Sequence, residues 1–449
     1  MVATTSRRRA NLAAAAGLLL LLSAACGGSS APTTAPSTTP SASDCSVAGQ
    51  NAQVLAIMQS WYYWYTSLPA NVSPSSYAST DALLDAVRQQ PLDRFTYFTT
   101  QAADQAFYGA GQYVGYGLGF SLNAANDLVV SQVFPGSPAD QAGIARGDTI
   151  TAINGIPVPT LVANNQLETE LGGSSPGVTT TFSYTDLAST AHTATVVSAV
   201  VTQPSVDRVA VLSEAGQKVG YILFNSFIDT SNAALDQAFA QFATEGVKQL
   251  VIDERYNGGG EVTVAQHLAS LIAGNSYTGK TLTTLTFNDK HTDQNETIPF
   301  QTVANPLDLQ QVFFVTSDAT ASASELIVNS LAPYIHVVTV GSATFGKPVG
   351  EDGFNVCTNV LYPITFKISN ASGYGDYFSG LPPTCPAADD VTHPLGDPAE
   401  ASLSTALGYV RTGACGAAAA APGGARILAD STRRWRHSLQ GWRQLVNAY

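Results

Sequence analysis

Apolar residues in the first hundred positions recur at helical spacing. They return every three or four positions between residues 50 and 100, and a second stretch of this kind covers residues 78–90. The apolar positions of the first stretch are Val54, Ile57, Met58, Trp61, Trp64, Tyr65 and Leu68. This spacing predicts a small helical domain, in which the aromatic run 61–65 is better explained by packing than by a ligand site.

From about residue 106 to residue 201 the pattern changes to short runs rich in β-branched and aromatic residues, punctuated by glycine. Such runs between turn residues predict strands. The predicted strands cover residues 116–122, 127–134, 148–155, 179–184 and 193–201, and two short helices fit between them at 137–143 and 160–171. The pattern predicts a small β-rich domain.

The body from about residue 215 to residue 412 alternates apolar runs with amphipathic stretches. The apolar runs predict strands at 219–227, 249–255, 311–317 and 336–342, and the amphipathic stretches predict helices at 230–246, 262–274 and 322–334. This alternation is typical of a layered α/β core. The whole chain is therefore predicted to be an α/β multidomain protein.

The N-terminus has the pattern of an export signal. Arg7, Arg8 and Arg9 precede an apolar run that is shorter than the ~20 residues of a membrane-spanning helix. The run ends in SAAC at Cys26, which resembles a bacterial lipobox and would make Cys26 the lipidated first residue of the mature protein. The alternative is an ordinary secretory signal cleaved nearby. Residues 27–43, rich in Ser, Thr, Pro and Gly, predict a flexible tether.

Net charge excludes one class of partner. The chain has 20 basic and 33 acidic residues, a formal charge of −13. Arginines are concentrated in the signal and in the last 26 residues, so the body between them is more acidic than the total suggests. An acidic body argues against nucleic acid as a partner.

Four cysteines remain if Cys26 carries lipid. An even number in an exported chain predicts two disulfides. We favour pairing Cys357 with Cys385 and Cys45 with Cys415, although four cysteines allow three pairings and the sequence does not choose between them.

Ser322 stands where an apolar strand runs into a helix. Its Ser-x-x-Glu pattern with Glu325 is also that of a capping box, and capping alone is the commoner role of such a serine. The same helix start offers the Ala323 amide and a positive dipole end to a developing oxyanion. The residue types therefore also predict a nucleophile beside an oxyanion donor.

A base and further backbone donors lie in two other segments. Lys347 is 25 residues beyond Ser322, after an apolar strand and in a segment with no other basic residue. A lysine acts as a general base only when burial favours its neutral form. The turn NGGG at 257–260 follows the strand 249–255 and has no side chains on Gly259 and Gly260 to block a substrate. The three segments together predict a Ser/Lys serine hydrolase.

The β-rich region resembles a bacterial PDZ domain in two segments, YGLGF at 116–120 and SPADQAGIARGDTITAINGIPV at 137–158. In such a domain the glycine loop holds a peptide's terminal carboxylate and the peptide backbone adds to the sheet edge. The peptide-binding residues that this resemblance implies are Tyr116, Gly117, Leu118, Gly119 and Phe120. The alternative is a β-barrel whose glycines only make turns.

From the small helical domain at the N-terminal end, which we call the helical cap, to about residue 412, the chain resembles the carboxy-terminal processing, or tail-specific, proteases. The resemblance implies that Ser322 is the nucleophile, Lys347 the general base, and the Ala323 amide with Gly259 or Gly260 the oxyanion hole. It implies a crotonase-like ββα peptidase core, a PDZ domain that gates it, and flexible polypeptide C-terminal tails as substrates.

One residue departs from the family pattern. The position four after the lysine usually carries a glutamine that orients it, whereas this chain has Glu351. A carboxylate there favours the charged lysine, against the base role, unless it is protonated or turned away. A catalytically weak PDZ binding lipoprotein on a protease fold is therefore the second function hypothesis, and a histidine base, His336 or His267, is the second mechanism.

Other catalytic patterns are excluded by their context. The G-x-S-x-G match at 173–177 lies between a helix and a strand, the reverse of a nucleophile elbow. The six histidines show no metal-ligand spacing, so we expect no metal and no cofactor.

The predicted domains span the chain in six parts. They are a lipoprotein signal at 1–26, a linker at 27–44, a helical cap at 45–104, a PDZ domain at 105–202, a peptidase core at 203–415, and a linker with a basic tail at 416–449. The tail has helically spaced tryptophans and arginines that suit an anionic surface, or it is an unconstrained extension. The expected location is the outer face of a bacterial membrane, held there by the lipid anchor.

Overall fold

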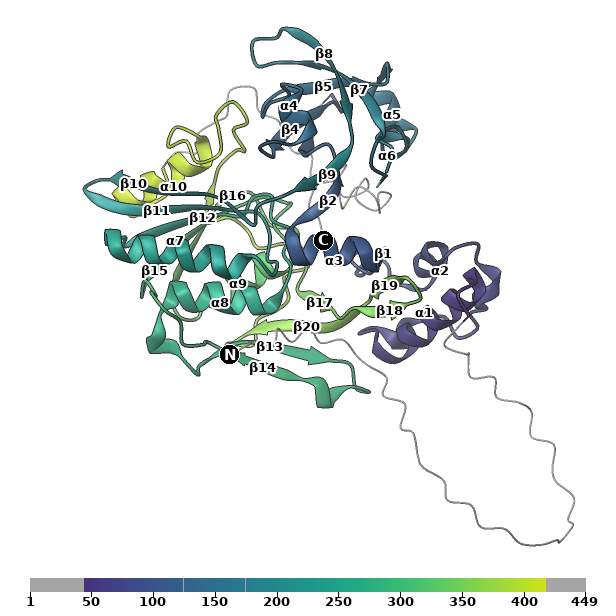
Figure 1. The fold of residues 1–449 in the computed structure, drawn as a ribbon. Coiled ribbons are helices and arrows are strands. Elements are labelled where there is room, and N and C mark those ends of the chain that lie inside the picture. Colours follow the sequence, from purple (N-terminus) through teal and green to yellow (C-terminus); the bar gives the residue numbers. More distant parts are fainter. Residues whose placement is uncertain (1–43, 124, 174, 417–449) are drawn as a thin grey trace, which may run out of the picture. The chain divides into compact units, whose positions relative to one another are not determined.

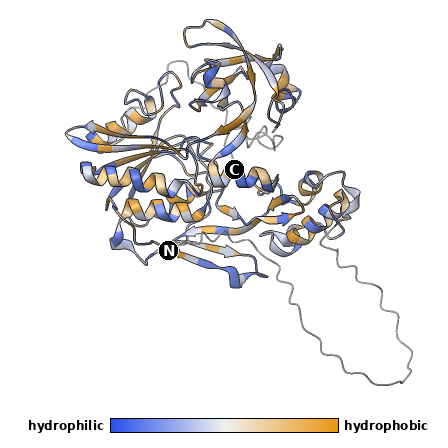
Figure 2. Cartoon of the chain, in the orientation of Figure 1, coloured by the Kyte–Doolittle hydropathy of each residue, from blue (hydrophilic) through white to orange (hydrophobic). Residues whose placement is uncertain are grey.

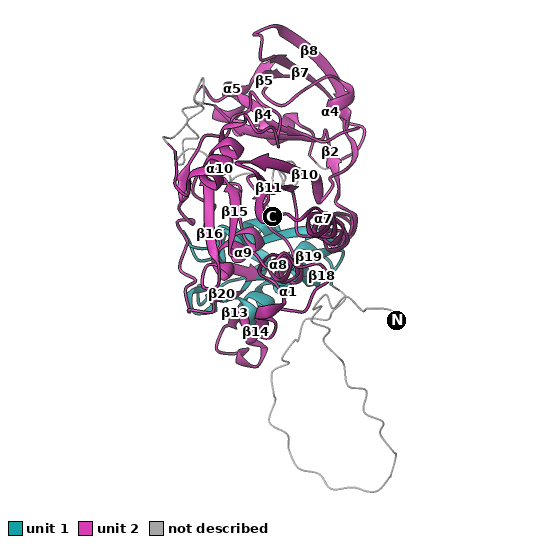
Figure 3. Ribbon diagram, turned by 90° about the vertical axis from the view of Figure 1, so that its left-hand side faces the viewer, with its two compact units in different colours: residues 1–101, 351–365 teal, residues 102–350, 366–449 magenta. Residues whose placement is uncertain are grey.

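The computed structural model describes residues 44–416, with positions 124 and 174 left out. The proposed signal, Cys26, nearly all of the linker, and the basic tail lie outside the described residues. Within the described part the chain forms two compact units (Figures 1 and 3). The fold is the predicted α/β multidomain architecture, with a helical N-terminal region, a β-rich domain and a layered α/β core.

The first unit joins residues up to 101 with residues 351–365, drawn in teal in Figure 3. Its apolar stretches form the expected helices, with Val54, Leu55 and Met58 buried along the first of them. The elements are α1 (Val47–Trp61), two short 3-10 turns, α2 (Thr80–Val87), β1 (Tyr97–Thr100), β18 (Phe354–Val356) and β19 (Asn359–Tyr362). The last three form one antiparallel sheet in the order β1-β19-β18, so a distant hairpin completes this unit.

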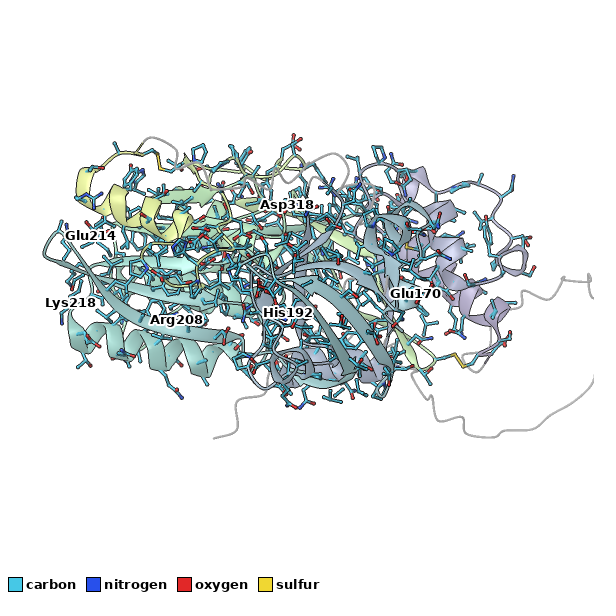
Figure 4. All side chains as sticks on the ribbon, turned by 90° about the horizontal axis from the view of Figure 1, so that it is seen from above. Glu170, His192, Arg208, Glu214, Lys218 and Asp318 are labelled. Atoms are coloured by element: carbon cyan, nitrogen blue, oxygen red, sulfur yellow. A yellow bond between two sulfur atoms is a disulfide. The ribbon has the colours of Figure 1, made fainter. Side chains whose placement is uncertain are left out.

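The disulfides correct the pairing expected from the sequence. Cys45 pairs with Cys357 and Cys385 with Cys415, and both bonds are drawn in yellow in Figure 4. The expected pairing was wrong because it ignored the β18–β19 hairpin, which brings Cys357 into the first unit beside the chain that leads into α1.

The β-rich domain, which resembles a PDZ domain in sequence, lies in the second unit. Its sheet has the order β3-β4-β5-β7-β8, which leaves β3 at an edge. The elements from the start of this unit are α3 (Gln101–Ala110), β2 (Gln112–Gly115), β3 (Leu118–Leu122), β4 (Leu128–Val133), α4 (Pro138–Gln141), β5 (Thr149–Ile153), β6 (Ile156–Pro157), α5 (Val158–Ala163), α6 (Leu167–Glu170), β7 (Thr179–Thr185), β8 (Ala191–Val197) and β9 (Ala199–Thr202). The single helix expected at 160–171 is two, because Asn165 between them has φ 55°, which ends the first helix.

The layered α/β core is built on a six-stranded sheet of order β10-β11-β12-β15-β16-β21. All neighbours from β11 onward are parallel, and only β10 is antiparallel. The strands are β10 (Val206–Glu214), β11 (Gln217–Phe224), β12 (Gln249–Asp253), β15 (Gln311–Thr316), β16 (His336–Gly341) and β21 (Cys385–Pro386). A second sheet, β14-β13-β20-β17, contains β13 (Thr281–Phe287), β14 (Glu296–Pro299), β17 (Val349–Glu351) and β20 (Ile364–Asn370).

Helices cover both faces of the six-stranded sheet (Figure 1). One face packs on α10 (Ala401–Thr412), whose Leu403, Ala406 and Leu407 join a core with residues of the four central strands. The other face is covered by α7 (Ser231–Glu245), α8 (Val262–Ala273) and α9 (Ala323–Leu331). In Figure 2, α7 and α8 show both colours along their length, as expected of helices with one face in a core.

None of the helices in the described part of the chain is long and apolar enough to cross a membrane.

Candidate active site

The proposed functional residues follow the carboxyl ends of three neighbouring parallel strands. The NGGG turn follows β12, Ser322 follows β15, and Lys347 follows β16. The strand before Ser322 therefore lies between the strands that lead to the turn and to Lys347. Because carboxyl ends of parallel strands share one edge of the sheet, segments far apart in sequence meet there.

Ser322 has a backbone conformation that L-residues rarely adopt. Its φ is 56° and its ψ is −115°, immediately before α9. The preceding loop is fixed to the end of β12, because the Thr320 hydroxyl donates to the Glu254 carbonyl (2.7 Å) and the Ala321 amide to the Asn257 carbonyl (3.1 Å). Strained conformations persist where neighbours over-determine them, and they cluster at functional sites.

Capping does not explain this conformation. Glu325 does complete its half of the capping box, since its Oε2 accepts a hydrogen bond from the Ser322 amide (3.1 Å). An ordinary capping serine such as Ser79 at α2 has extended backbone, with φ −151°. The positive φ of Ser322 therefore requires a reason other than capping.

The glycine turn lies directly against Ser322. A Cβ on Gly259 would lie 2.7 Å from the Ser322 Cβ and 2.8 Å from the Ala323 nitrogen, so only glycine fits there. A Cβ on Gly260 would lie 2.1 Å from the Phe227 carbonyl oxygen. The structure thus brings the turn, Ser322 and the Ala323 amide together.

Asn257, which sequence reasoning did not single out, holds the turn in place. Its Oδ1 accepts from the Gly259 amide (2.9 Å) and its Nδ2 donates to the Phe224 carbonyl (3.0 Å). Its carbonyl oxygen accepts from the Ser324 hydroxyl (3.1 Å) on α9. The Gly259 amide, one of the two expected oxyanion donors, thus donates to Asn257 in this structure.

Lys347 is buried, with 4% of its surface exposed. Its backbone amide donates to Glu325 Oε2 at 2.8 Å, the same oxygen that accepts from the Ser322 amide. The Gly346 amide donates to Glu325 Oε1 at 2.7 Å, and so does the Thr344 hydroxyl. One carboxylate therefore fixes the backbone of both the serine and the lysine.

Glu325 is itself fully buried. Burial raises the pKa of its carboxyl group, and the hydrogen bonds from Thr344, Lys347, Gly346 and Ser322 oppose that rise. The Ser-x-x-Glu pattern in the sequence pointed to this residue, but only as a helix cap. Its bonds to the lysine segment depend on tertiary structure and left no local signal.

Glu351 ends β17 and is half-buried. It begins the part of the chain that belongs to the first compact unit, whereas Lys347 lies in the second unit. Its role therefore stays a prediction.

Two histidines were considered as alternative bases. His336 pairs in register with Gln311, the first residue of β15, whereas Ser322 follows the last. Five strand steps of about 3.3 Å put His336 roughly 16 Å from that strand end. His267 lies on α8, where its Nε2 is 2.8 Å from Asp236 Oδ1 and its Nδ1 is 2.9 Å from the side-chain Nε2 of Gln301.

The expected peptide-binding loop spans the entry into β3. The buried hydroxyl of Tyr116 is 2.6 Å from the Thr180 hydroxyl and donates to the Leu171 carbonyl at 3.0 Å. Gly117 has φ 82°, and a Cβ there would lie 2.1 Å from the Ser137 Cβ. Leu118, Gly119 and Phe120 then form the start of edge strand β3. Tyr116 is thus a core anchor, while the backbone of the next residues forms the edge.

No group of His, Cys, Asp and Glu side chains within residues 44–416 is arranged to hold a metal ion.

Three family models match the chain. The peptidase family S41 model matches residues 218–375, the S41 N-terminal domain model residues 49–97, and a PDZ domain model residues 129–163. Together with the fold, these matches give the chain the domain composition of an S41 serine peptidase.

Within that class the chain is similar to C-terminal processing proteases. It is 28% identical to a carboxyl-terminal-processing protease of Picosynechococcus sp. over 55% of this chain and 57% of that protein. It is 27% identical to the chloroplastic C-terminal processing peptidase of Tetradesmus obliquus over 64% of this chain and 63% of that protein. The alignments thus span less than two thirds of either relative's length.

A solved structure supports the fold across most of the chain. A candidate S41 protease from Bacteroides fragilis superimposes with a TM-score of 0.65 at 26% identity, covering 80% of this chain and 96% of that one.

Proposed function

We propose that this chain is an exported serine endopeptidase that uses Ser322 and Lys347 as a dyad and selects polypeptides by their C-terminal tails. The observation that carries the proposal is the shared carboxylate of Glu325, which binds the amides of both residues beside a strained Ser322. Similarity to C-terminal processing proteases supports the same activity.

In the proposed mechanism Lys347 accepts the proton of the Ser322 hydroxyl as the serine oxygen attacks the scissile carbonyl carbon. The resulting oxyanion accepts hydrogen bonds from the Ala323 amide and from Gly260 or Gly259. The tetrahedral intermediate then expels the new amino terminus, which takes the proton from Lys347. Water repeats the sequence to release the acyl group from Ser322.

The N-terminal end of α9 assists this chemistry. Its dipole places partial positive charge beside the oxyanion. Ser322 immediately precedes this helix, so the proposed nucleophile is adjacent in the chain to the residue whose amide would bind the oxyanion. In this scheme Glu351 tunes the lysine, and its neutral form would suit the base role better than its carboxylate.

The PDZ domain would select the substrate. Because β3 is a sheet edge, an extended tail can add to it as a further strand, with its carboxylate at the amides that follow Gly117. The proposed ligand is a flexible polypeptide C-terminus, and nucleic acid is not a proposed partner.

The two disulfides support an oxidising, extracytoplasmic compartment. We propose that the signal at 1–26 exports the chain and that Cys26 anchors it to the membrane by lipid. The six predicted domain boundaries belong to this proposal.

The test is cleavage of an unfolded protein with an apolar C-terminus by protein that begins at residue 44. Ser322→Ala and Lys347→Ala are each expected to lower the rate by ~10³-fold or more, since each removes one member of an interdependent pair. Survival of activity in Lys347→Ala alone would transfer the base role to another group. Tail binding without any cleavage would favour the PDZ binding protein.

A further inference from the structure

A segment without any proposed catalytic residue provides counter-charges for a buried arginine beside the site. Arg255 follows β12, and its side chain is 1% exposed. Its guanidinium pairs with Asp253, and also with Asp389 and Glu400 from the segment 385–415. We call residues 385–415 the strap.

The strap's carboxylates bind Arg255 in a directed geometry. Glu400 accepts from both terminal nitrogens of the guanidinium, at 2.7 and 2.8 Å, and Asp389 accepts from one of them at 3.1 Å. Asp389 also accepts from Arg146 (2.8 Å). Three of the five hydrogen bonds that the guanidinium makes to side chains are to the strap, and the other two are to Asp253. The position of Arg255 therefore depends on the strap as well as on the end of its own strand.

Arg255 leads directly into the glycine turn. Its carbonyl oxygen accepts from the Ser317 hydroxyl, which belongs to the loop before the nucleophile. The next residue, Tyr256, donates its hydroxyl to Asp389 at 2.5 Å. Asn257, which follows, binds the Gly259 amide. The strap therefore holds the two residues that immediately precede the turn.

A disulfide closes the strap. Cys385 begins it within β21, which pairs with β16, and Cys415 ends it after α10. Outside this bond, α10 is held by its apolar face and by an exposed pair between Arg411 and Glu214, a residue labelled in Figure 4. Cys385 is fully buried, whereas Cys415 is exposed, so a reductant can attack from the Cys415 side.

We propose that the strap positions the oxyanion turn through Arg255, and that the Cys385–Cys415 disulfide keeps the strap rigid enough for hydrolysis. Arg255 is then a positioning residue, and the activity responds to the redox state of this bond. A dithiol reductant would convert the disulfide to two thiols and become a cyclic disulfide itself. The inference rests on the proposed peptidase function.

The experiment compares two double variants that each remove one disulfide. Cys385→Ser/Cys415→Ser opens the strap, and Cys45→Ser/Cys357→Ser removes the bond of the first unit as the matched control. Peptide cleavage gives kcat and KM, and hydrogen exchange followed by mass spectrometry gives the exchange rate of amides 254–261. The exchange measurement does not depend on activity.

Opening the strap is expected to speed exchange at 254–261 and to lower kcat roughly tenfold to a hundredfold, the range for misplaced or lost transition-state donors, with KM within about twofold. The control variant is expected to keep the wild-type exchange rate at 254–261 and the wild-type kcat. Arg255→Lys, which keeps the charge but not the guanidinium fork, should lower kcat in the same selective way.

Unchanged exchange and unchanged kcat in Cys385→Ser/Cys415→Ser would overturn the inference, and so would equal losses in the control. If that variant does not fold, mild reduction of folded wild type, with thiols counted by mass spectrometry, gives the same comparison. If oxidised wild type cleaves nothing, the proposed function fails; faster exchange at 254–261 then still supports the strap, and unchanged exchange refutes it.

Discussion

Replacing Ser322 by glycine should inactivate the protein and at the same time make it more stable. The reason is the backbone at this position, φ 56° and ψ −115°, which is strained for serine. Glycine adopts the mirror image of every conformation open to L-residues, and this one mirrors an ordinary extended conformation. The strain should therefore disappear in Ser322→Gly.

The magnitude follows from two opposing effects. A residue held in such a conformation costs about 1–3 kcal/mol. The extra freedom of glycine in the unfolded chain offsets about 0.5–1 kcal/mol of the relief. The net gain is about 1 kcal/mol, which corresponds to a melting temperature roughly 1–3 °C higher for a unit of this size. Ser322→Ala keeps the Cβ and the strain, so its stability should stay close to that of wild type.

Thermal and urea unfolding of wild type, Ser322→Gly and Ser322→Ala test this. Ser79 provides the control, because it is a capping serine with extended backbone whose side chain accepts from the Ala82 amide. There, alanine should cost about 1 kcal/mol and glycine a few tenths. If Ser322 follows the order seen at Ser79, with glycine no more stable than wild type, the serine is only a cap and the reasoning from strain is refuted.

Three further substitutions have defined outcomes. Glu325→Gln places an amide group against backbone N–H donors, and should lower kcat by about tenfold to a hundredfold with little change in KM, as steady-state cleavage would show. Burial raises the pKa of the Asp389 carboxyl group, but the nearby Arg146 and Arg255 lower it by more, so the net pKa is about 2. The Asp389 carboxylate stabilises the folded state by about 2 kcal/mol above its usual pKa of 3.8, and this contribution is lost as the pH falls toward 2. In Asp389→Asn, the urea concentration at the unfolding midpoint should therefore vary less with pH across that range. Glu351→Gln should move the lower edge of the pH–rate profile to lower pH, because an amide no longer favours the charged lysine; an unchanged profile would contradict its proposed role.

Local sequence patterns were sufficient to predict the strands and the helix that hold the site residues. The run 312–315 is continuously apolar because β15 is buried on both faces, and the polar residues after it introduce α9. The run 249–255 before the glycines is predicted to be a strand by the same kind of pattern. These patterns placed Ser322 and the turn at strand ends, and the parallel sheet brings such ends together.

The remaining features depend on contacts that no local pattern records. The β18–β19 hairpin joins a unit that begins three hundred residues earlier, and for this reason the disulfide pairing could not be predicted. The strap is a similar case, since Asp389 and Glu400 pair with Arg255 across more than 130 positions. In the sequence they are ordinary acidic residues near the C-terminal end of the core.

Backbone strain and the burial of charged groups both cost free energy at this site, and contacts between distant segments offset both costs. Ser322 stores backbone strain, and Arg255, Glu325 and Lys347 lie almost out of contact with water, where charge is expensive. Each is held by partners from a different segment: Glu325 binds the serine and lysine amides, and the strap binds the arginine. Such bonds need all of these segments in place, so we expect the geometry of the site to depend on the complete fold. A change in the strap, far along the chain from Ser322, should therefore alter catalysis without touching the substrate.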